Sequence, residues 1–204
     1  MIELLVTDFL QYAATSEARQ RFNEYNSRKK TIEPLLSEEN IDNVKPDELE
    51  DVFRSLQTCQ AHPSYLMILE RYGLESLREH LKYFLYGSDP LEIRFDTFFE
   101  QIPEMPQLAL MEVATFAQPR NFCIWDEAAK KTIIYIGHSR MHGLSETSFQ
   151  EKIAGLDYVW AKLALNHVRQ ILSAYAGSRC DFVDVFFFTN FVYEKWVMKK
   201  IVDV

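Results

Sequence analysis

Asp126 is the residue of this 204-residue sequence whose type and position most plainly allow chemistry. It precedes the helix-forming segment Glu127 to Lys131, so its carboxylate can accept hydrogen bonds from the free backbone N–H groups of the first turn. The plain interpretation is a helix N-cap, which stabilises a helix by about 1 kcal/mol. The alternative is a carboxylate with a functional role.

Histidines and cysteines offer two short spacings that a zinc site could use, Cys59-x2-His62 and His138-x3-His142. The two pairs are distant in the chain and neither is a complete ligand set, so we expect no metal and no cofactor. His167 lies on an apolar helical stripe and is interpreted as a hydrogen-bonded core histidine. The three cysteines are widely spaced, which is typical of buried free thiols in a reducing cytoplasm.

Charge is distributed unevenly along the chain. The net charge is −8, but the segment from residue 120 to 140 has four basic and two acidic residues, +2 in all, which leaves −10 for the remainder. An acidic protein is a poor general binder of nucleic acid, whereas a local basic face fits a narrow DNA contact or an ordinary solvated helix face. The candidate DNA-binding residues are Arg120, Lys130, Lys131 and Arg140.

The elements around Asp126 form a recognisable order. The segment Gln107 to Ala117 is apolar on nearly every side, which predicts a central, buried helix. A tight turn over residues 102–106 precedes it, and Gln118 and Pro119 end it. Gly137 is expected to end the helix that Asp126 begins.

This order of turn, buried helix, connector, aspartate and helix resembles the helix-hairpin-helix DNA glycosylases of the endonuclease III class. Pro103, Glu104, Met105 and Pro106 lie at the hairpin, and Asp126 lies where the family has its catalytic aspartate. The resemblance implies that Asp126 stabilises positive charge on the sugar as the base departs, or assists attack by water. It also implies double-stranded DNA as a partner.

The sequence departs from the family pattern at three places. Glu104 and Pro106 occupy the positions of the hairpin glycines, so a negative charge and a missing backbone donor stand where a phosphate would dock. Leu108 occupies the position of the lyase lysine and cannot form a Schiff base. A cysteine-rich iron–sulfur tail is not found.

The remaining chain predicts an all-α fold. Only 6 glycines and 7 prolines occur, which favours long helices over a many-stranded sheet. Apolar periodicity predicts helices over residues 3 to about 26 with a break near Thr15-Ser16, and over 46–58, 63–72, 74–86, 90–101 and 156–176.

The length fits a single all-α domain, residues 1–204, divided into two lobes near residue 88, about 1–88 and 89–204, with a hairpin-like core at 102–137. The aromatic segment from Asp181 to about Lys200 is too apolar to be a free tail. It either packs back on the core or forms a homodimer interface. No signal peptide and no membrane-spanning apolar run is present, which favours a cytoplasmic protein.

Three functional hypotheses follow. The first is a glycosylase-like protein without full catalytic equipment that binds DNA or a DNA-processing partner. The second is an active monofunctional glycosylase that uses Asp126. The third is a structural or interaction protein, dimeric through its C-terminal helix, with no role on nucleic acid.

Overall fold

The protein is described by a computed structural model that covers residues 1–60 and 64–199. Helices and turns make up these residues, and no strand occurs among them, which confirms the predicted all-α class. The α-helices are α1 (Ile2–Ala13), α2 (Ser16–Leu35), α3 (Pro46–Ser55), α4 (Gln57–Gln60), α5 (Ser64–Tyr72), α6 (Leu74–Tyr86), α7 (Leu91–Gln101), α8 (Gln107–Ala117), α9 (Glu127–Tyr135), α10 (His138–Met141), α11 (Gly155–Ala176) and α12 (Phe182–Val192). Short 3₁₀ turns, η1 (Ile41–Asn43) and η2 (Thr147–Phe149), and a π-helical turn, η3 (Tyr193–Val197), complete the order.

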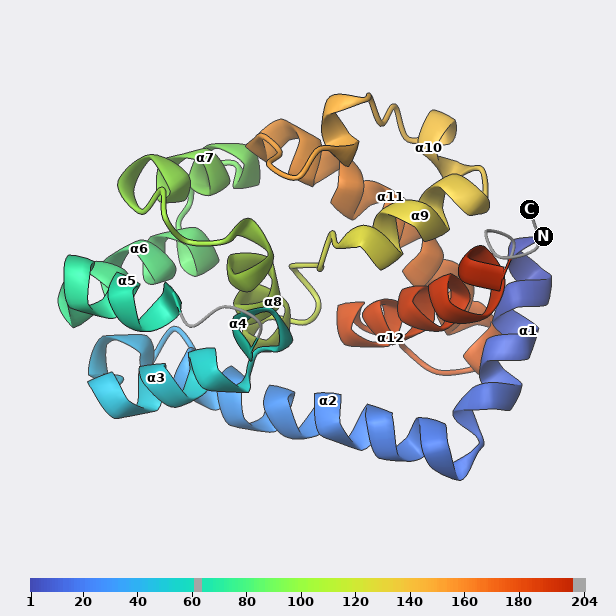
Figure 1. The fold of residues 1–204 in the computed structure, drawn as a ribbon, viewed down its shortest axis with the longest axis horizontal. Coiled ribbons are helices and arrows are strands. Elements are labelled where there is room, and N and C mark those ends of the chain that lie inside the picture. The colour runs from blue at the N-terminus through green and yellow to red at the C-terminus, as the bar shows by residue number, and fades with distance from the viewer. Residues whose placement is uncertain (61–63, 200–204) are drawn as a thin grey trace.

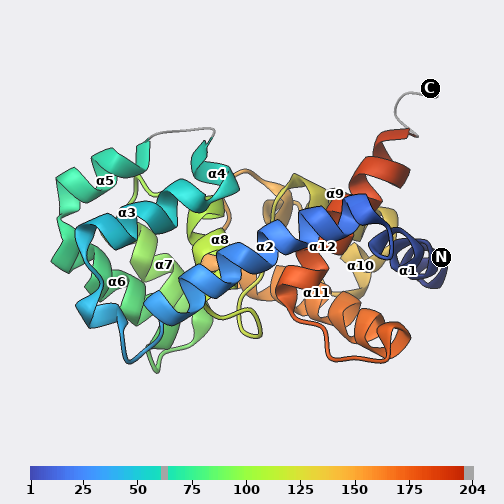
Figure 2. The same cartoon turned by 90° about the horizontal axis from the view of Figure 1, so that it is seen from below.

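The helices gather into two lobes (Figures 1 and 2). Helices α3 to α8 form the first lobe, and α1 with α9 to α12 forms the second. The long helix α2 runs along both: it packs on α8, and its Phe22 and Tyr25 contact Phe187 and Phe186 of α12. The expected division near residue 88 does not describe this grouping, because α7 and α8 stay with the first lobe and α1 joins the second.

Local capping explains where several helices begin and end. The predicted break near Thr15 is confirmed: the Thr15 hydroxyl accepts a hydrogen bond from the Ala18 backbone at 3.2 Å and starts α2. The single helix predicted over 46–58 is wrong, because Leu56 adopts an extended backbone and separates α3 from α4. The break expected at 61–63 lies outside the described residues. Gly137, at φ +78°, ends α9 as predicted.

Helix α8 lies at the centre of the fold, as its composition predicts. Every residue from Ala109 to Ala117 is buried, including Glu112 and Thr115. Thr115 satisfies its hydroxyl by donating to the Met111 carbonyl at 2.7 Å. A helix covered on all sides is a rigid base for the turn before it and the connector after it.

The aromatic C-terminal segment packs back on the core. In α12, Phe187, Phe188 and Phe191 surround Phe9 of α1, with ring centroids 5.5, 5.3 and 5.5 Å from the Phe9 ring. Nearly all side chains of α12 are buried. The helix packs on α1 and α11, and the homodimer remains a prediction.

None of the described helices combines the length and the apolar composition that a membrane span requires.

Candidate functional site

The turn between α7 and α8 places one carboxylate at the surface. The Met105 backbone donates to the Ile102 carbonyl at 3.1 Å, and both side chains are buried. Pro103, Glu104 and Pro106 are exposed. Glu104 accepts a hydrogen bond from the Tyr72 hydroxyl and pairs with Arg71 at 2.5 Å, so its negative charge is fixed at the turn.

The connector from α8 to α9 is anchored in the core before it reaches Asp126. The Tyr158 hydroxyl bonds both backbone groups of Cys123, donating to its carbonyl at 2.9 Å and accepting from its N–H at 3.2 Å. The Trp125 indole N–H donates to the Ser148 carbonyl at 2.7 Å. The buried hydrogen bonds of Cys123 and Trp125, so close in sequence to Asp126, fix the position of the Asp126 backbone.

Asp126 caps α9, as the sequence predicts. Its Oδ1 accepts from the Ala129 backbone N–H at 2.8 Å, and the side chain remains partly accessible. Burial raises the pKa of this carboxyl to about 6; the Ala129 hydrogen bond lowers it and the charge of Glu112 raises it further. The raised pKa indicates that water solvates the Asp126 carboxylate poorly. Carboxylates with raised pKa values are found in functional sites and also in some purely structural positions.

Glu112 of α8 is a second carboxylate near Asp126, and it is fully buried. It accepts from the backbone N–H groups of Gln57 and Thr58 at 2.8 and 3.0 Å, and from the Thr58 hydroxyl at 2.7 Å. Arg28 of α2 lies 3.6 Å away. Glu112 thus joins three helices and adds a negative charge near Asp126.

The four candidate DNA-binding residues have different surroundings. Lys130 is largely buried and donates to the Gln150 carbonyl at 2.6 Å, while Lys131 is exposed and lies 3.5 Å from Glu127. Arg120 and Arg140 are exposed. Arg120 also lines a polar cleft of about 410 Å³. The structure therefore leaves Arg120 and Arg140 best placed to contact a ligand.

Other charged residues line the same cleft. Among its lining residues are Lys29, Glu33, Arg120, Arg179 and Asp181, a sum of three positive and two negative charges. Lys29 pairs with Asp181 at 2.5 Å, which neutralises one charge of each sign. The cleft is therefore weakly positive, and Arg120 and Arg179 are its basic residues outside that pair.

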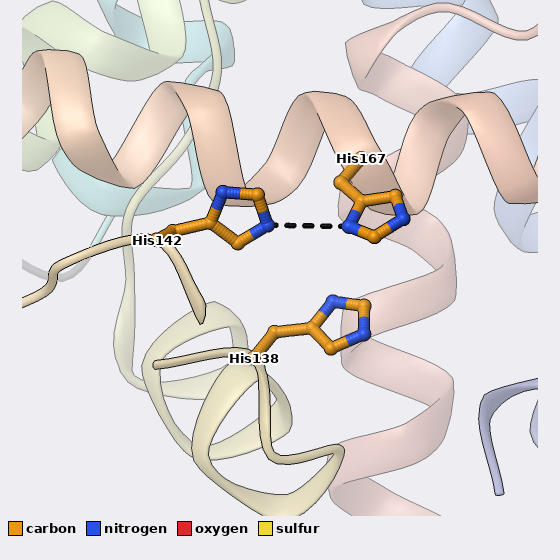
Figure 3. A group of neighbouring side chains, drawn as sticks. All are labelled: His138, His142 and His167. Atoms are coloured by element: carbon orange, nitrogen blue, oxygen red, sulfur yellow. Dashed lines mark hydrogen bonds between the residues drawn. The ribbon is translucent and has the colours of Figure 1, made fainter. Parts of the chain in front are cut away.

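Three histidines from two separate segments of the chain come together in the second lobe. His138 and His142 lie on and just after α10, and His167 lies on α11; their ring nitrogens approach one another within 4.8 Å (Figure 3). His167 is hydrogen-bonded to His142, as predicted for a core histidine, but it is partly exposed rather than buried in the core. The Cys59-x2-His62 spacing lies outside the described side chains.

Comparison with known proteins finds no relative: no family model matches the sequence, and neither a curated protein nor a solved structure matches it.

Two features of the site were missed from the sequence. Glu112 is a buried acid in an otherwise apolar helix, and a buried acid requires hydrogen-bond donors. His167 joins the His138–His142 pair only because the fold brings α11 beside α10. Glu112 and His167 are each a polar residue on an apolar helix face, and that pattern is the sequence signal that points to both.

Proposed function

We propose that the protein is a helix-hairpin-helix glycosylase-like protein that binds duplex DNA where its two lobes meet, with Asp126 facing an extruded nucleotide. The observation that carries the proposal is the environment of Asp126. The residue begins α9 directly after an anchored connector from the buried α8, remains partly accessible, and has a pKa of about 6.

The chemistry suited to Asp126 is stabilisation of positive charge. At neutral pH a carboxyl with this pKa is mostly ionised, yet it has lost much of its hydration. Such a carboxylate interacts strongly with a sugar that becomes cationic as its base departs. Leu108 offers no amine, so the proposal predicts base release without strand cleavage.

A narrow basic surface is consistent with contact to only a few phosphates. Arg120 and Arg140 are exposed, and Arg120 lines the weakly positive cleft. Glu104 would repel a phosphate at the hairpin. With about two to four phosphate contacts, the logarithm of the DNA affinity should fall with the logarithm of salt concentration with a slope of roughly −2 to −4.

The first test is fluorescence anisotropy of a labelled duplex titrated with the protein across a salt series. We expect binding that weakens with salt, and Arg120→Ala and Arg140→Ala should each reduce the slope by about 1. Lys152→Ala, a change at an exposed lysine outside the candidate surface, is the matched control. Absence of binding at low salt would reject the proposal.

The second test separates catalysis from binding. Duplexes with single damaged or mismatched bases are incubated with the protein, and abasic sites are revealed by alkali. We expect Asp126→Asn to abolish base release and to leave DNA affinity unchanged. Retained activity in that variant would remove Asp126 from the chemistry.

Glu104 favours a second candidate, a non-catalytic protein that binds a partner through the same surface. Its carboxylate is held at the turn by Tyr72 and Arg71, which suits a basic protein partner better than a phosphate. Under this candidate no duplex tested loses a base. Release of a base from any of these duplexes would count against it.

A further inference from the structure

The three histidines of the second lobe come from two segments that the fold brings together. His138 and His142 are four residues apart across the single turn of α10, so they project from the same face. Gly137, in the left-handed conformation, separates α9 from α10 and lets the chain turn there. His167 approaches from α11, and the three rings face one another (Figure 3).

Two of the ring nitrogens already have the separation of metal ligands. His142 Nε2 and His167 Nδ1 are 3.2 Å apart. In a tetrahedral zinc site with Zn–N bonds of 2.0–2.1 Å, two nitrogen ligands are about 3.3 Å apart. All three ligand atoms lie within 4.8 Å of one another, so side-chain shifts of about 1–1.5 Å would complete the set.

The third nitrogen lacks a partner. His138 Nδ1 is buried and makes no hydrogen bond, and the His138 ring stacks on that of His167 with centroids 4.7 Å apart. A buried polar atom with no partner is costly and calls for an ion or a hydrogen-bonding group to satisfy it. A cation bound to this nitrogen, in the plane of the His138 ring, would satisfy it.

Two of the three histidines have surroundings that favour the uncharged ring. Burial lowers the pKa of His138 and of His142, and the neighbouring His167 lowers both further. Uncharged imidazole is the ligand form, and metal binding otherwise requires loss of a proton.

We propose that His138, His142 and His167 bind one divalent transition-metal ion, Zn²⁺ by preference, through one ring nitrogen each. Imidazole nitrogen suits Zn²⁺, Cu²⁺ and Ni²⁺ rather than Mg²⁺ or Ca²⁺. Three protein ligands leave a fourth position for water or an exogenous ligand, as in catalytic zinc sites. His142 and His167 are partly exposed, which gives that position access to solvent. The proposal is independent of the DNA-binding function.

The test uses the full chain without a histidine tag, stripped of metal with a chelator. Zn²⁺ is titrated in competition with a chromophoric chelator, and Co²⁺ is used as a spectroscopic probe. We expect one ion per chain and visible Co²⁺ bands of tetrahedral intensity. His142→Ala and His167→Gln should each weaken Zn²⁺ binding at least ~100-fold, since loss of a second-shell partner alone costs 10–100-fold.

The matched control is His80→Ala, a partly exposed histidine on α6 of the first lobe, which should bind Zn²⁺ as the wild type does. Helix content by circular dichroism is compared for every variant, and His142, partly exposed, is the substitution least expected to unfold the protein. The proposal is overturned if the wild type binds no stoichiometric Zn²⁺. It is also overturned if folded His142→Ala and His167→Gln retain wild-type affinity.

Discussion

Among single residues, Asp126 combines two properties that oppose each other. Its hydrogen bond to Ala129 stabilises the start of α9, but burial makes its charge unfavourable. A neutral side chain of the same shape would make the same cap at lower cost, since asparagine caps helices as well as aspartate does. The presence of a charge at this under-solvated position is what motivates a functional role.

This opposition gives a pH-dependent stability difference between Asp126→Asn and the wild type. The folded pKa of about 6 lies above the reference 3.8, so the stability that Asp126 contributes is complete below pH 4 and is lost as pH rises through 6. The variant does not titrate. Its free energy of unfolding relative to the wild type should rise by about 1–2 kcal/mol between pH 4 and 7, allowing for partial exposure.

Urea unfolding at several pH values measures this difference, and Asp8→Asn, at a partly exposed position of α1 outside the site, should show no such rise. A difference that is flat between pH 4 and 7 would mean that the Asp126 carboxyl is well solvated.

Glu112 stabilises the junction of three helices. Glu112→Ala would leave the first N–H groups of α4 without their acceptor and Arg28 without its ion-pair partner, and we expect a loss of roughly 3 kcal/mol. Glu112→Gln keeps an acceptor oxygen and should lose about 1 kcal/mol. Glu79→Ala on the exposed face of α6 should change stability by less than ~0.5 kcal/mol. Chemical denaturation of the three variants checks the order.

At the level of helices, periodicity predicts α11 and the burial of α8 well, because both follow from apolar spacing alone. Helix ends are less predictable. The break at Leu56 has no glycine or proline beside it, and it coincides with the hydrogen bonds that Glu112 accepts from Gln57 and Thr58. A tertiary contact of this kind is invisible to local sequence.

The contact between α7 and α11 depends on one glycine. A Cβ at Gly155 would lie 2.1 Å from the backbone oxygen of Glu92, so Gly155→Ala requires the two helix ends to separate. We expect a loss of about 2–3 kcal/mol, seen as a lower thermal midpoint. Ala154→Gly, at the exposed neighbouring position, should cost no more than ~0.5 kcal/mol, since glycine is tolerated at an N-cap. A stable Gly155→Ala would show that the approach is not tight.

At the level of the whole molecule, the sequence predicts the fold class and the position of Asp126 but not the grouping of helices. Composition and spacing are local properties, whereas the joining of α1 to α12 arises from aromatic contacts between residues some 180 positions apart. The histidine group was missed for the same reason. Long-range packing decides both features.

Ion pairs fasten α2 to the second lobe. Arg21 forms a two-fold hydrogen-bonded pair with Glu194 at 2.9 and 2.8 Å, but both side chains are partly exposed. Glu194→Gln should lower the free energy of unfolding by only about 0.5–1 kcal/mol, and the loss should shrink in high salt. A double-mutant cycle with Arg21→Gln isolates the pair. A coupling above ~2 kcal/mol would show that the pair is shielded from solvent.

The placement of α1 has a consequence for synthesis on the ribosome. Helices α3 to α8 have emerged before α12 is made, so the first lobe has most of its partners early. The rings of Phe187, Phe188 and Phe191 that surround Phe9 of α1 are made some 180 residues after it. We therefore expect chaperones to engage the nascent chain at α1, and to release it when α12 has formed.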